Sequence, residues 1–265
     1  MNEAAPDFTF RIPVIHGIIG AVSTSGNRKN EEKAAVMRYR AVFFDRDNTL
    51  TYYNPEKAEW LNRVVSSWSG KPLDLPYEKM MNLFGQAAEG RKPWYRNLED
   101  ERAFFRRYYR YLLIGEGVED NLEERAEQLF RELWCNNDRL LFPETVEVLE
   151  YFRGHGFRMG VISDTSPSLE YSLRQLGIAE YFSSFTASSL VGAGKPSPVI
   201  FNAALDSLGV TAEESIYVDD YPPEADGARA LGFTSFLIDR NGVSGGWTVT
   251  SLKELIGFVE NAARE

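Results

Sequence analysis

Apolar residues are spaced in two ways along this chain, and each spacing predicts a different kind of structure. Between residues 55 and 140 they recur on one side of a helical repeat, as Trp60, Leu61, Val64 and Trp68 do. The expected helices of this stretch are residues 56–68, 77–88, 98–114 and 122–134. No strand-like alternation of apolar and polar positions is visible across the stretch, so we predict an all-helical segment.

Short apolar runs alternate with helix-length segments after Pro143. The expected strands are residues 158–162, 184–187, 215–218 and 234–238. The expected helices are residues 144–153, 168–176, 199–208, 224–231 and 252–263. A further apolar strand, residues 41–44, comes before the all-helical segment. Strands that are separated by helices pair in parallel through right-handed crossovers, with helices on both faces of the sheet.

These patterns predict an α/β protein with a parallel sheet in a three-layer core and an inserted all-helical domain. The core would comprise residues 38–54 and 141–265, and the insertion residues 55–140. Residues 1–37 end in a polar run before the first strand, so we expect a poorly ordered N-terminal extension. Ligands of open parallel sheets bind beyond the carboxyl ends of the strands, so the residues that follow each strand are the candidate site.

Three of the predicted strands end directly in polar residues of catalytic types. These residues are Asp45 and Asp47 after the first strand, Ser163 and Asp164 after the second, and Asp219 and Asp220 after a later one. Carboxylates at the end of a buried strand are costly unless a cation meets them. Two of them can share a hard divalent ion through oxygen ligands, and an aspartate can also act as a covalent nucleophile in phosphoryl transfer.

A lysine in a Gly-Lys-Pro-Ser-Pro segment lies between the last two of these strand ends. Pro196 biases the preceding Lys195 toward an extended conformation. Ser197 can cap a helix that starts at Pro198. A lysine held rigidly in front of a helix is well placed to act as a fixed positive charge.

Taken in this order, the motifs resemble those of the haloacid dehalogenase-like (HAD) hydrolase superfamily, in its phosphatase branch with a helical cap inserted after the first strand. The matching residues are Asp45, Asp47 and Thr49, then Ser163, then Lys195-Pro196, then Asp219-Asp220 followed by Gly227-Ala228. The resemblance covers the chain from about residue 40 to its C-terminus. It implies a Rossmann-like core, with residues 55–140 as a cap domain that closes over the site and selects the substrate.

The resemblance also implies catalytic roles. Asp45 would be the nucleophile that forms an aspartyl-phosphate intermediate, and Asp47 the general acid and base. Ser163 and Lys195 would bind the transferring phosphoryl group. Thr49 and Asp164 would lie beside the substrate, Thr49 orienting the loop or Asp47. Relatives often have Asn or Gly at the position of Asp164, and a third carboxylate near a dianion is unfavourable unless it is paired or points away.

For the metal, the resemblance implies one Mg²⁺ ion held by Asp45, Asp47 and Asp220, with the backbone carbonyl of Asp47 as its contact. Asp220 is favoured over Asp219 as the direct ligand, which leaves Asp219 and Glu224 as outer-shell acids. Arg46, between the first two aspartates, is expected to point to solvent.

Composition narrows the classes of function. The net charge of −10 gives no basic surface for nucleic acid or an acidic membrane, but a small anionic substrate remains compatible. Cys135 is the single cysteine and is expected in a buried helical position, which excludes an intrachain disulfide framework or a cysteine zinc cluster. The chain has only two histidines, His16 and His155, so a Ser-His-Asp triad is not expected. No apolar stretch reaches the roughly 18 residues of a membrane span, so we expect a cytoplasmic protein.

We therefore expect a Mg²⁺-dependent phosphatase acting on a small phosphorylated metabolite. A phosphomutase of the same superfamily would share every catalytic residue and stays open as an alternative. A non-catalytic metal-binding or partner-binding module is a further alternative, although such modules usually lose the nucleophile or the lysine. A haloacid dehalogenase lacks the second aspartate, and a cation-pumping ATPase needs membrane spans. The basic, aromatic segment Arg91–Arg96 either contacts the leaving group or is plain loop surface.

Overall fold

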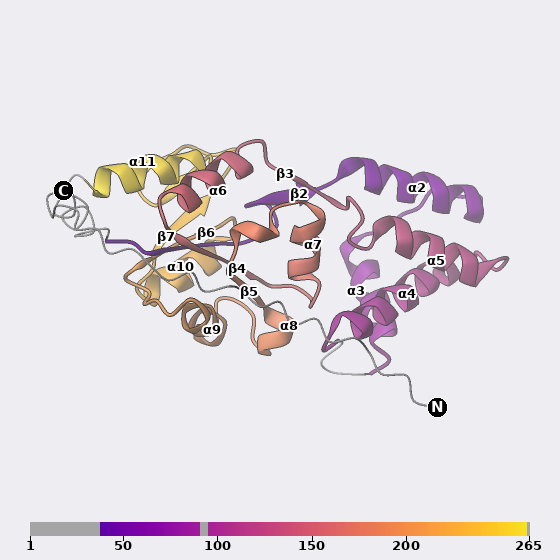
Figure 1. Ribbon diagram of the computed structural model, residues 1–265. Helices are drawn as coiled ribbons and strands as arrows, with labels where there is room; N and C mark the ends of the chain where they lie inside the picture. Colours follow the sequence, from indigo (N-terminus) through magenta and orange to yellow (C-terminus); the bar gives the residue numbers. More distant parts are fainter. Residues whose placement is uncertain (1–37, 91–94, 264–265) are drawn as a thin grey trace, which may run out of the picture. The chain divides into compact units, whose positions relative to one another are not determined.

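A parallel six-stranded sheet forms the centre of the computed structural model, which describes residues 38–90 and 95–263 (Figure 1). Its strand order is β5-β4-β1-β6-β7-β8, and every neighbouring pair is parallel. The strands are β1 Ala41–Phe44, β4 Arg158–Ser163, β5 Ser184–Ala187, β6 Ser215–Asp219, β7 Thr234–Ile238 and β8 Thr248–Val249. The predicted N-terminal extension, residues 1–37, lies outside the described residues.

The central strand β1 is buried on both faces, and its side chains alternate between two hydrophobic clusters. Val42 and Phe44 belong to one cluster, and Ala41 and Phe43 to the other. The helices that contribute to the first cluster are α6 Thr145–Gly154, α7 Leu169–Gln175 and α11 Lys253–Ala262. Those of the second are α9 Pro198–Leu208 and α10 Pro222–Ala230. Helices thus cover both faces of the sheet, which confirms the predicted Rossmann-like three-layer α/β fold.

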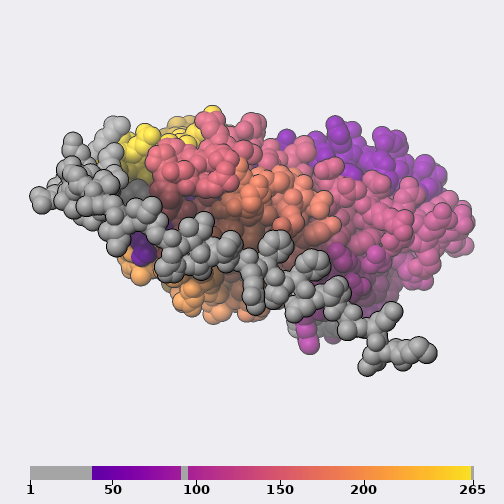
Figure 2. All heavy atoms as spheres, viewed as in Figure 1, coloured from indigo at the N-terminus to yellow at the C-terminus, as the bar shows by residue number. Residues whose placement is uncertain are grey.

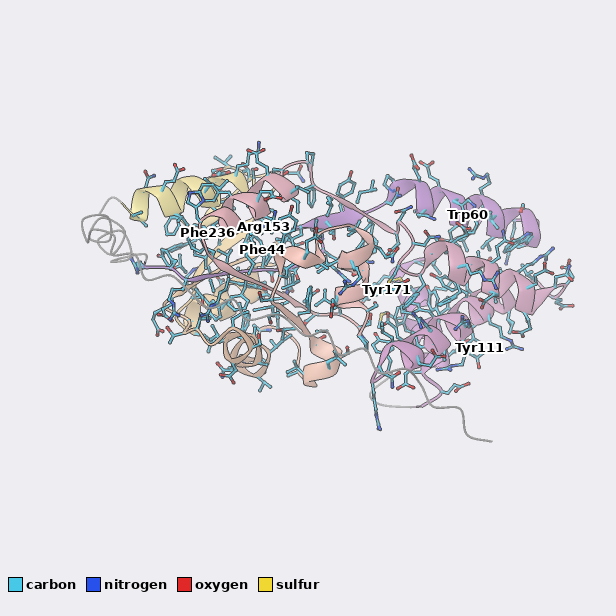
Figure 3. All side chains as sticks on the ribbon, viewed as in Figure 1. Phe44, Trp60, Tyr111, Arg153, Tyr171 and Phe236 are labelled. Atoms are coloured by element: carbon cyan, nitrogen blue, oxygen red, sulfur yellow. The ribbon has the colours of Figure 1, made fainter. Side chains whose placement is uncertain are left out.

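Side chains fill the spaces between these elements. In the all-atom view, atoms fill the space that the ribbon drawing leaves open between α6 and α7, where the turn Ala179–Tyr181 lies next to both helices (Figure 2). Phe44 and Phe236 lie within the sheet region of the molecule, among α6, α11 and the strands (Figure 3). Within the described part of the chain, none of the helices combines the length and the apolar content that crossing a bilayer requires.

Four helices between β2 and β3 form a separate helical block. They are α2 Pro55–Ser69, α3 Tyr77–Ala88, α4 Leu98–Gly115 and α5 Leu122–Leu133. The Asn54 side chain caps α2 by accepting a hydrogen bond from the Glu56 amide at 3.0 Å, and Asn97 caps α4 in the same way. The block has its own hydrophobic cluster, and Trp60 and Tyr111 lie among its helices (Figure 3). Its four helices occur where helical periodicity predicts them.

A short antiparallel pair of strands joins the helical block to the sheet. β2 spans Thr51–Tyr53 and β3 spans Arg139–Leu141, with Thr51 opposite Leu141. The prediction that residues 55–140 contain no strand was therefore wrong at their end, since β3 begins at Arg139. Strands of three residues are too short to show alternation, and these two exist because each supplies the hydrogen-bonding partner of the other. The two-residue strand β8 and the four-residue helix α8, Ser188–Val191, were missed for the same reason.

Gly160 offers a test of how tightly β1 and β4 are packed. It lies opposite Phe43 in the sheet, and a Cβ atom at Gly160 would be 2.8 Å from two carbons of the fully buried Phe43 ring. We expect Gly160→Ala to lower the free energy of unfolding by about 1–3 kcal/mol, measured by urea denaturation, because the ring has no space to move into. Gly257→Ala is the matched control, since a Cβ there, inside α11, would meet no atom within 4 Å. The control should be neutral or stabilising, and an equal loss in both variants would contradict this account.

Candidate active site

A buried lysine lies among three carboxylates at the carboxyl edge of the sheet. Lys195 Nζ is 2.7 Å from Asp45 Oδ1, from Asp219 Oδ2 and from Glu224 Oε2. Asp45 directly follows β1 and Asp219 ends β6, and these two strands are parallel neighbours. Their carboxyl ends therefore meet, as the sequence predicts. The Lys195 side chain is only 1% exposed, so these contacts replace its hydration almost completely.

The loop that carries Lys195 is fixed by close contacts on two sides. The Lys195 backbone amide donates to Asp164 Oδ1 at 2.9 Å. A Cβ atom on Gly194 would be 2.9 Å from Asp164 Oδ2, so glycine is what allows this approach. A Cβ on Gly227 would be 2.4 Å from Pro196 Cβ, because α10 packs directly against the loop. Asp164 is thus paired with the lysine loop, the arrangement in which its charge is tolerable near an anionic substrate.

Two of these carboxylates, together with Asp220, could also hold a metal ion. Asp45, Asp219 and Asp220 can each offer one carboxylate oxygen so that all three oxygens lie within 4.8 Å of one another. Asp219 is engaged on both oxygens, by Lys195 and the Tyr217 hydroxyl on Oδ2 and by the Tyr221 amide on Oδ1 at 2.9 Å. Asp220 is partly exposed and accepts one hydrogen bond, from Asn48 Nδ2 at 2.9 Å. Of Asp219 and Asp220, Asp220 therefore has more carboxylate oxygen lone pairs free to bind a metal ion.

Burial and crowding change the acidities in this cluster. Burial raises the pKa of Asp45 to about 8, although Lys195 acts in the opposite direction, and the charge of Asp219 adds to the increase. Burial also raises the pKa of Glu224 to about 7, again against the effect of Lys195. The pKa of Asp220 is raised for the same reason, burial, with the nearby Asp219 charge adding to it. Without a further cation, the cluster holds more negative charge than Lys195 can balance.

Asp47 has the opposite environment. Arg46 Nη2 donates to its Oδ2 at 2.8 Å, and Arg139 Nε donates to its Oδ1 at 2.6 Å. Burial alone would raise the pKa of Asp47, but the two guanidinium groups outweigh burial and hold it well below its usual range. The Asp47 carboxylate is accordingly not part of the acidic cluster around Asp45.

The two arginines were not identified from sequence. Arg46 was expected to point to solvent, and this was wrong: it is 3% exposed and also donates to Thr165 Oγ1 at 2.9 Å and Ser172 Oγ at 3.3 Å. The tight loop after β1 turns its side chain inward, since the amides of Leu50 and Thr51 both bond back to the Arg46 carbonyl. Arg139 lies 92 residues from Asp47 on the unpredicted strand β3, so no local pattern signals it.

Ser163, Thr49 and the segment Arg91–Arg96 were also predicted for the site. Ser163 is buried at the end of β4, the strand next to β1. Thr49 is fully buried, and its hydroxyl has no hydrogen-bond partner among the described residues. The hydroxyl that reaches Asp47 belongs instead to Thr51, at 3.2 Å from Oδ1. In the segment Arg91–Arg96, residues 91–94 lie outside the described part of the chain, and Tyr95 lines the cavity described next.

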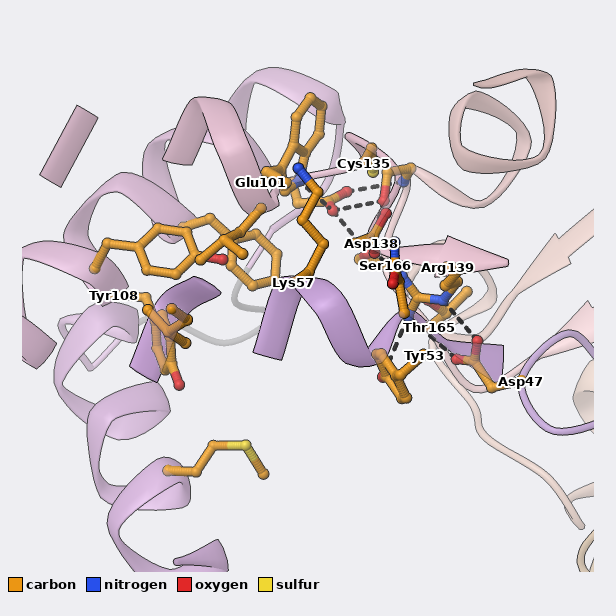
Figure 4. A pocket seen from close by; sticks show the side chains of 18 of the residues that line it. Asp47, Tyr53, Lys57, Glu101, Tyr108, Cys135, Asp138, Arg139, Thr165 and Ser166 are labelled. Carbon is orange, nitrogen blue, oxygen red and sulfur yellow. Dashed lines mark hydrogen bonds and ion pairs between the residues drawn. The ribbon is translucent and has the colours of Figure 1, made fainter. Parts of the chain in front are cut away.

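A cavity of about 550 Å³ opens beside Asp47, between the helical block and the loop that follows β4 (Figure 4). Asp47, Arg139 and Thr165 lie at one side of it, and Tyr108 at the other. Cys135 is buried in its wall, in the turn after α5 rather than in a helix. Asp45, Lys195, Asp219 and Asp220 are not among the lining residues.

Glu101 of α4 joins the helical block to the core at this cavity. Its carboxylate is 1% exposed and accepts hydrogen bonds from Ser166 Oγ at 2.8 Å, from Ser168 Oγ at 2.6 Å and from the Ser168 amide at 2.8 Å. Trp134 Nε1, from the end of the block, donates to it as well, at 3.0 Å. Among the described residues no cation pairs with this buried carboxylate, and these four donors take the place of water. Nothing in the local sequence distinguishes Glu101 from other acidic residues of α4.

Comparison with known proteins gives consistent matches. The profile of the haloacid dehalogenase-like hydrolase family matches residues 39–232. A phosphatase of Mycobacterium tuberculosis is 27% identical over 239 residues, which are 85% of this chain and 99% of that protein. The glyceraldehyde 3-phosphate phosphatase of Methanocaldococcus jannaschii is 25% identical, with 85% and 99% of the two chains covered.

Solved structures show the same fold. The HAD phosphatase of Thermococcus onnurineus superposes with a TM-score of 0.58 at 24% identity, over 83% of this chain and 97% of that one. A 2-haloacid dehalogenase of Pseudomonas syringae gives a TM-score of 0.62 at 23% identity, over 84% and 99% of the two chains. The family match covers most of the chain and includes Asp45, Asp47, Lys195, Asp219 and Asp220. The chain belongs to the haloacid dehalogenase-like hydrolase family.

Proposed function

We propose that this protein is a Mg²⁺-dependent phosphatase that hydrolyses a small phosphorylated metabolite through an aspartyl-phosphate on Asp45. Its family and its phosphatase relatives make it a phosphatase-type hydrolase. The observation that supports the covalent route is the 2.7 Å contact between Lys195 Nζ and Asp45 Oδ1 at the end of the central strand. A carboxylate can attack a phosphate dianion only where positive charge offsets their repulsion, and Lys195 supplies such a charge at the reacting group.

In the first half of the proposed reaction, an Asp45 carboxylate oxygen attacks phosphorus. A phosphorus–oxygen bond forms to Asp45, the bond to the ester oxygen breaks, and Asp47 gives that oxygen a proton. In the second half Asp47 takes a proton from water, whose oxygen bonds to the phosphorus of the aspartyl-phosphate. The bond between phosphorus and the Asp45 oxygen breaks, which releases inorganic phosphate and restores the Asp45 carboxylate. Ser163 and Lys195 would stabilise the charge on the transferring group throughout.

The chemistry of the donor set fits Mg²⁺. Asp45, Asp219 and Asp220 supply hard carboxylate oxygens, which this ion prefers, and these oxygens lie close enough together to share one ion. With Glu224, the cluster has four carboxylates and one ammonium group, so a divalent cation would balance most of the excess negative charge. Asp45 and Asp220 would hold the ion, and Asp47 could reach it only through its backbone carbonyl, because Arg46 and Arg139 engage its carboxylate. Bound Mg²⁺ would supply positive charge to the phosphoryl group.

The ion pairs of Asp47 bear on both of its roles. Arg46 and Arg139 hold it as a carboxylate and lower its pKa. They therefore disfavour the protonated form, which must donate to the leaving group and which also forms when water gives up its proton. We expect proton transfer to and from Asp47 to require a loosening of these contacts when substrate binds. The helical block, residues 55–140, would be the cap that brings substrate to this point.

The nucleophile is tested by Asp45→Asn. We expect turnover of p-nitrophenyl phosphate with Mg²⁺ to fall by about ten thousandfold, because the attacking carboxylate is lost. EDTA should abolish the activity of the unaltered protein, and added Mg²⁺ should restore it. Asp206→Asn, at an exposed aspartate of α9, is the matched control and should keep full activity. Near-normal turnover by Asp45→Asn would rule out the covalent route.

The lysine is tested by Lys195→Ala. We expect kcat to fall by about a hundredfold for every phosphate ester, because one well-placed charge on the transferring group is lost. Lys253→Ala is the control, since Lys253 pairs with Glu147 on the surface, where such pairs contribute little. A loss that varied strongly between esters would assign Lys195 to substrate selection instead of chemistry.

The raised pKa of Asp45 makes the stability of the metal-free protein depend on pH. A group whose pKa is higher in the folded chain stabilises the fold below its unfolded pKa, and that contribution is lost as the pH rises to the folded value. For Asp45 this window runs from about pH 4 to about pH 8. In EDTA, we expect the free energy of unfolding to fall across it by up to about 1.4 kcal/mol per pH unit.

Urea denaturation at a series of pH values measures this slope. Asp45→Asn should make it shallower, because the variant side chain does not titrate, and Glu224, whose pKa is also raised, should account for part of the remaining slope. Mg²⁺ should stabilise the protein most at the alkaline end, where Asp45 is ionised and can act as a ligand. An unchanged slope in Asp45→Asn would show that other groups carry the pH dependence.

A further inference from the structure

The cavity beside Asp47 has a chemistry that the proposed reaction does not use. We propose that it binds the leaving-group part of the substrate and that this part is apolar and about the size of an aromatic ring or larger. The preferred substrates would then be phosphate monoesters of apolar alcohols, and not of small polar acids or polyols. This inference rests on the proposed phosphatase function and adds the substrate class to it.

Position is the first argument. Asp47 lines the cavity, whereas Asp45 and Lys195 do not. In the proposed reaction Asp47 protonates the ester oxygen, so the group attached to that oxygen extends from Asp47 away from the phosphoryl site. Thr165 and Ser166, which follow β4, line the same side of the cavity (Figure 4). The space beyond Asp47 is therefore where the alcohol portion must lie.

The second argument is the character of the wall. Most of it comes from the helical block and is apolar or aromatic, with Leu61, Met80, Phe84, Phe105, Tyr108 and Trp134 among the residues. At about 550 Å³ the cavity falls within the size range of sites that enclose drug-sized ligands, well above what a two- or three-carbon alcohol needs. An apolar group would be drawn into it by the hydrophobic effect, whereas a polyol would lose hydration without compensation.

The third argument is that the charged groups of the wall already have partners. Asp47 is paired with Arg46 and Arg139, and Asp138 with Arg139. Lys57 Nζ donates to the Glu132 carbonyl at 2.7 Å. The Glu101 carboxylate accepts its four hydrogen bonds from Trp134, Ser166 and Ser168. Among the described residues, the charged side chains of this wall are thus satisfied by the protein, and the apolar surface is left to recognise the ligand.

Two alkyl esters with similar leaving oxygens test the proposal. We expect 2-phenylethyl phosphate to be hydrolysed with a kcat/KM about a hundredfold higher than that of ethyl phosphate, chiefly through a lower KM, because the ring leaves water for the apolar wall. Glycerol 1-phosphate should resemble ethyl phosphate. The product 2-phenylethanol should inhibit competitively, and ethanol at the same concentration should not.

A cavity-filling variant provides the structural control. Ala58 lines the cavity but is exposed on α2, so Ala58→Trp adds bulk without disturbing the core. We expect this variant to lose most of the preference for 2-phenylethyl phosphate, measured as the ratio of the kcat/KM values for the two esters. Ser67→Trp, at an exposed position of the same helix outside the cavity, should behave like the unaltered protein.

The outcomes separate the two proposals. Equal kcat/KM values for the two esters, or an equal loss on both in Ala58→Trp, would overturn the assignment of the cavity while leaving the phosphatase intact. Failure to hydrolyse any of the three esters or p-nitrophenyl phosphate with Mg²⁺ would instead overturn the proposed function. Should Ala58→Trp fail to fold, the comparison of the esters on the unaltered protein still decides the question.

Discussion

The burial of the Lys195 ammonium group among carboxylates is the interaction on which the rest of the site depends. Removing such an ion from water costs several kcal/mol, and only close opposite charges offset that cost. The partners come from three elements, with Asp45 after β1, Asp219 at the end of β6 and Glu224 on α10. A register shift of one residue in β6 would bring Val218 or Asp220 to the position of Asp219. The pairing of the sheet and the charge balance of the site are therefore fixed together.

Much of the fold could be predicted from the sequence, because the larger elements carry strong periodic signals. Helix α3 and strands β1, β5 and β7 have the expected bounds, and the other predicted elements differ by one or two residues at their ends. The short helix α8 was not predicted, nor were the short strands β2, β3 and β8. Two or three residues cannot show a period, and these segments become strands only because another part of the chain comes alongside them.

The arrangement of the candidate site could be predicted where its residues follow strands, and not elsewhere. Asp45, Ser163 and Asp220 lie at strand ends that the parallel topology brings to one edge of the sheet. Arg139 contacts Asp47, 92 residues away, and Glu101 contacts Ser166, 65 residues away, so these contacts exist only in the folded chain. The buried orientation of Arg46 likewise depends on Thr165 and Ser172, which come from the far side of the helical block in sequence.

The three-residue strand β3 has two structural roles. It is the segment through which the chain returns from the helical block to the sheet, and its first residue, Arg139, holds the Asp47 carboxylate. A displacement of the block that strains this return segment would act first on that guanidinium group. A weaker Arg139 contact would make Asp47 easier to protonate. If Asp47 is the acid–base group, a bulky ligand in the cavity would thus act on it through the helical block as well as by direct contact.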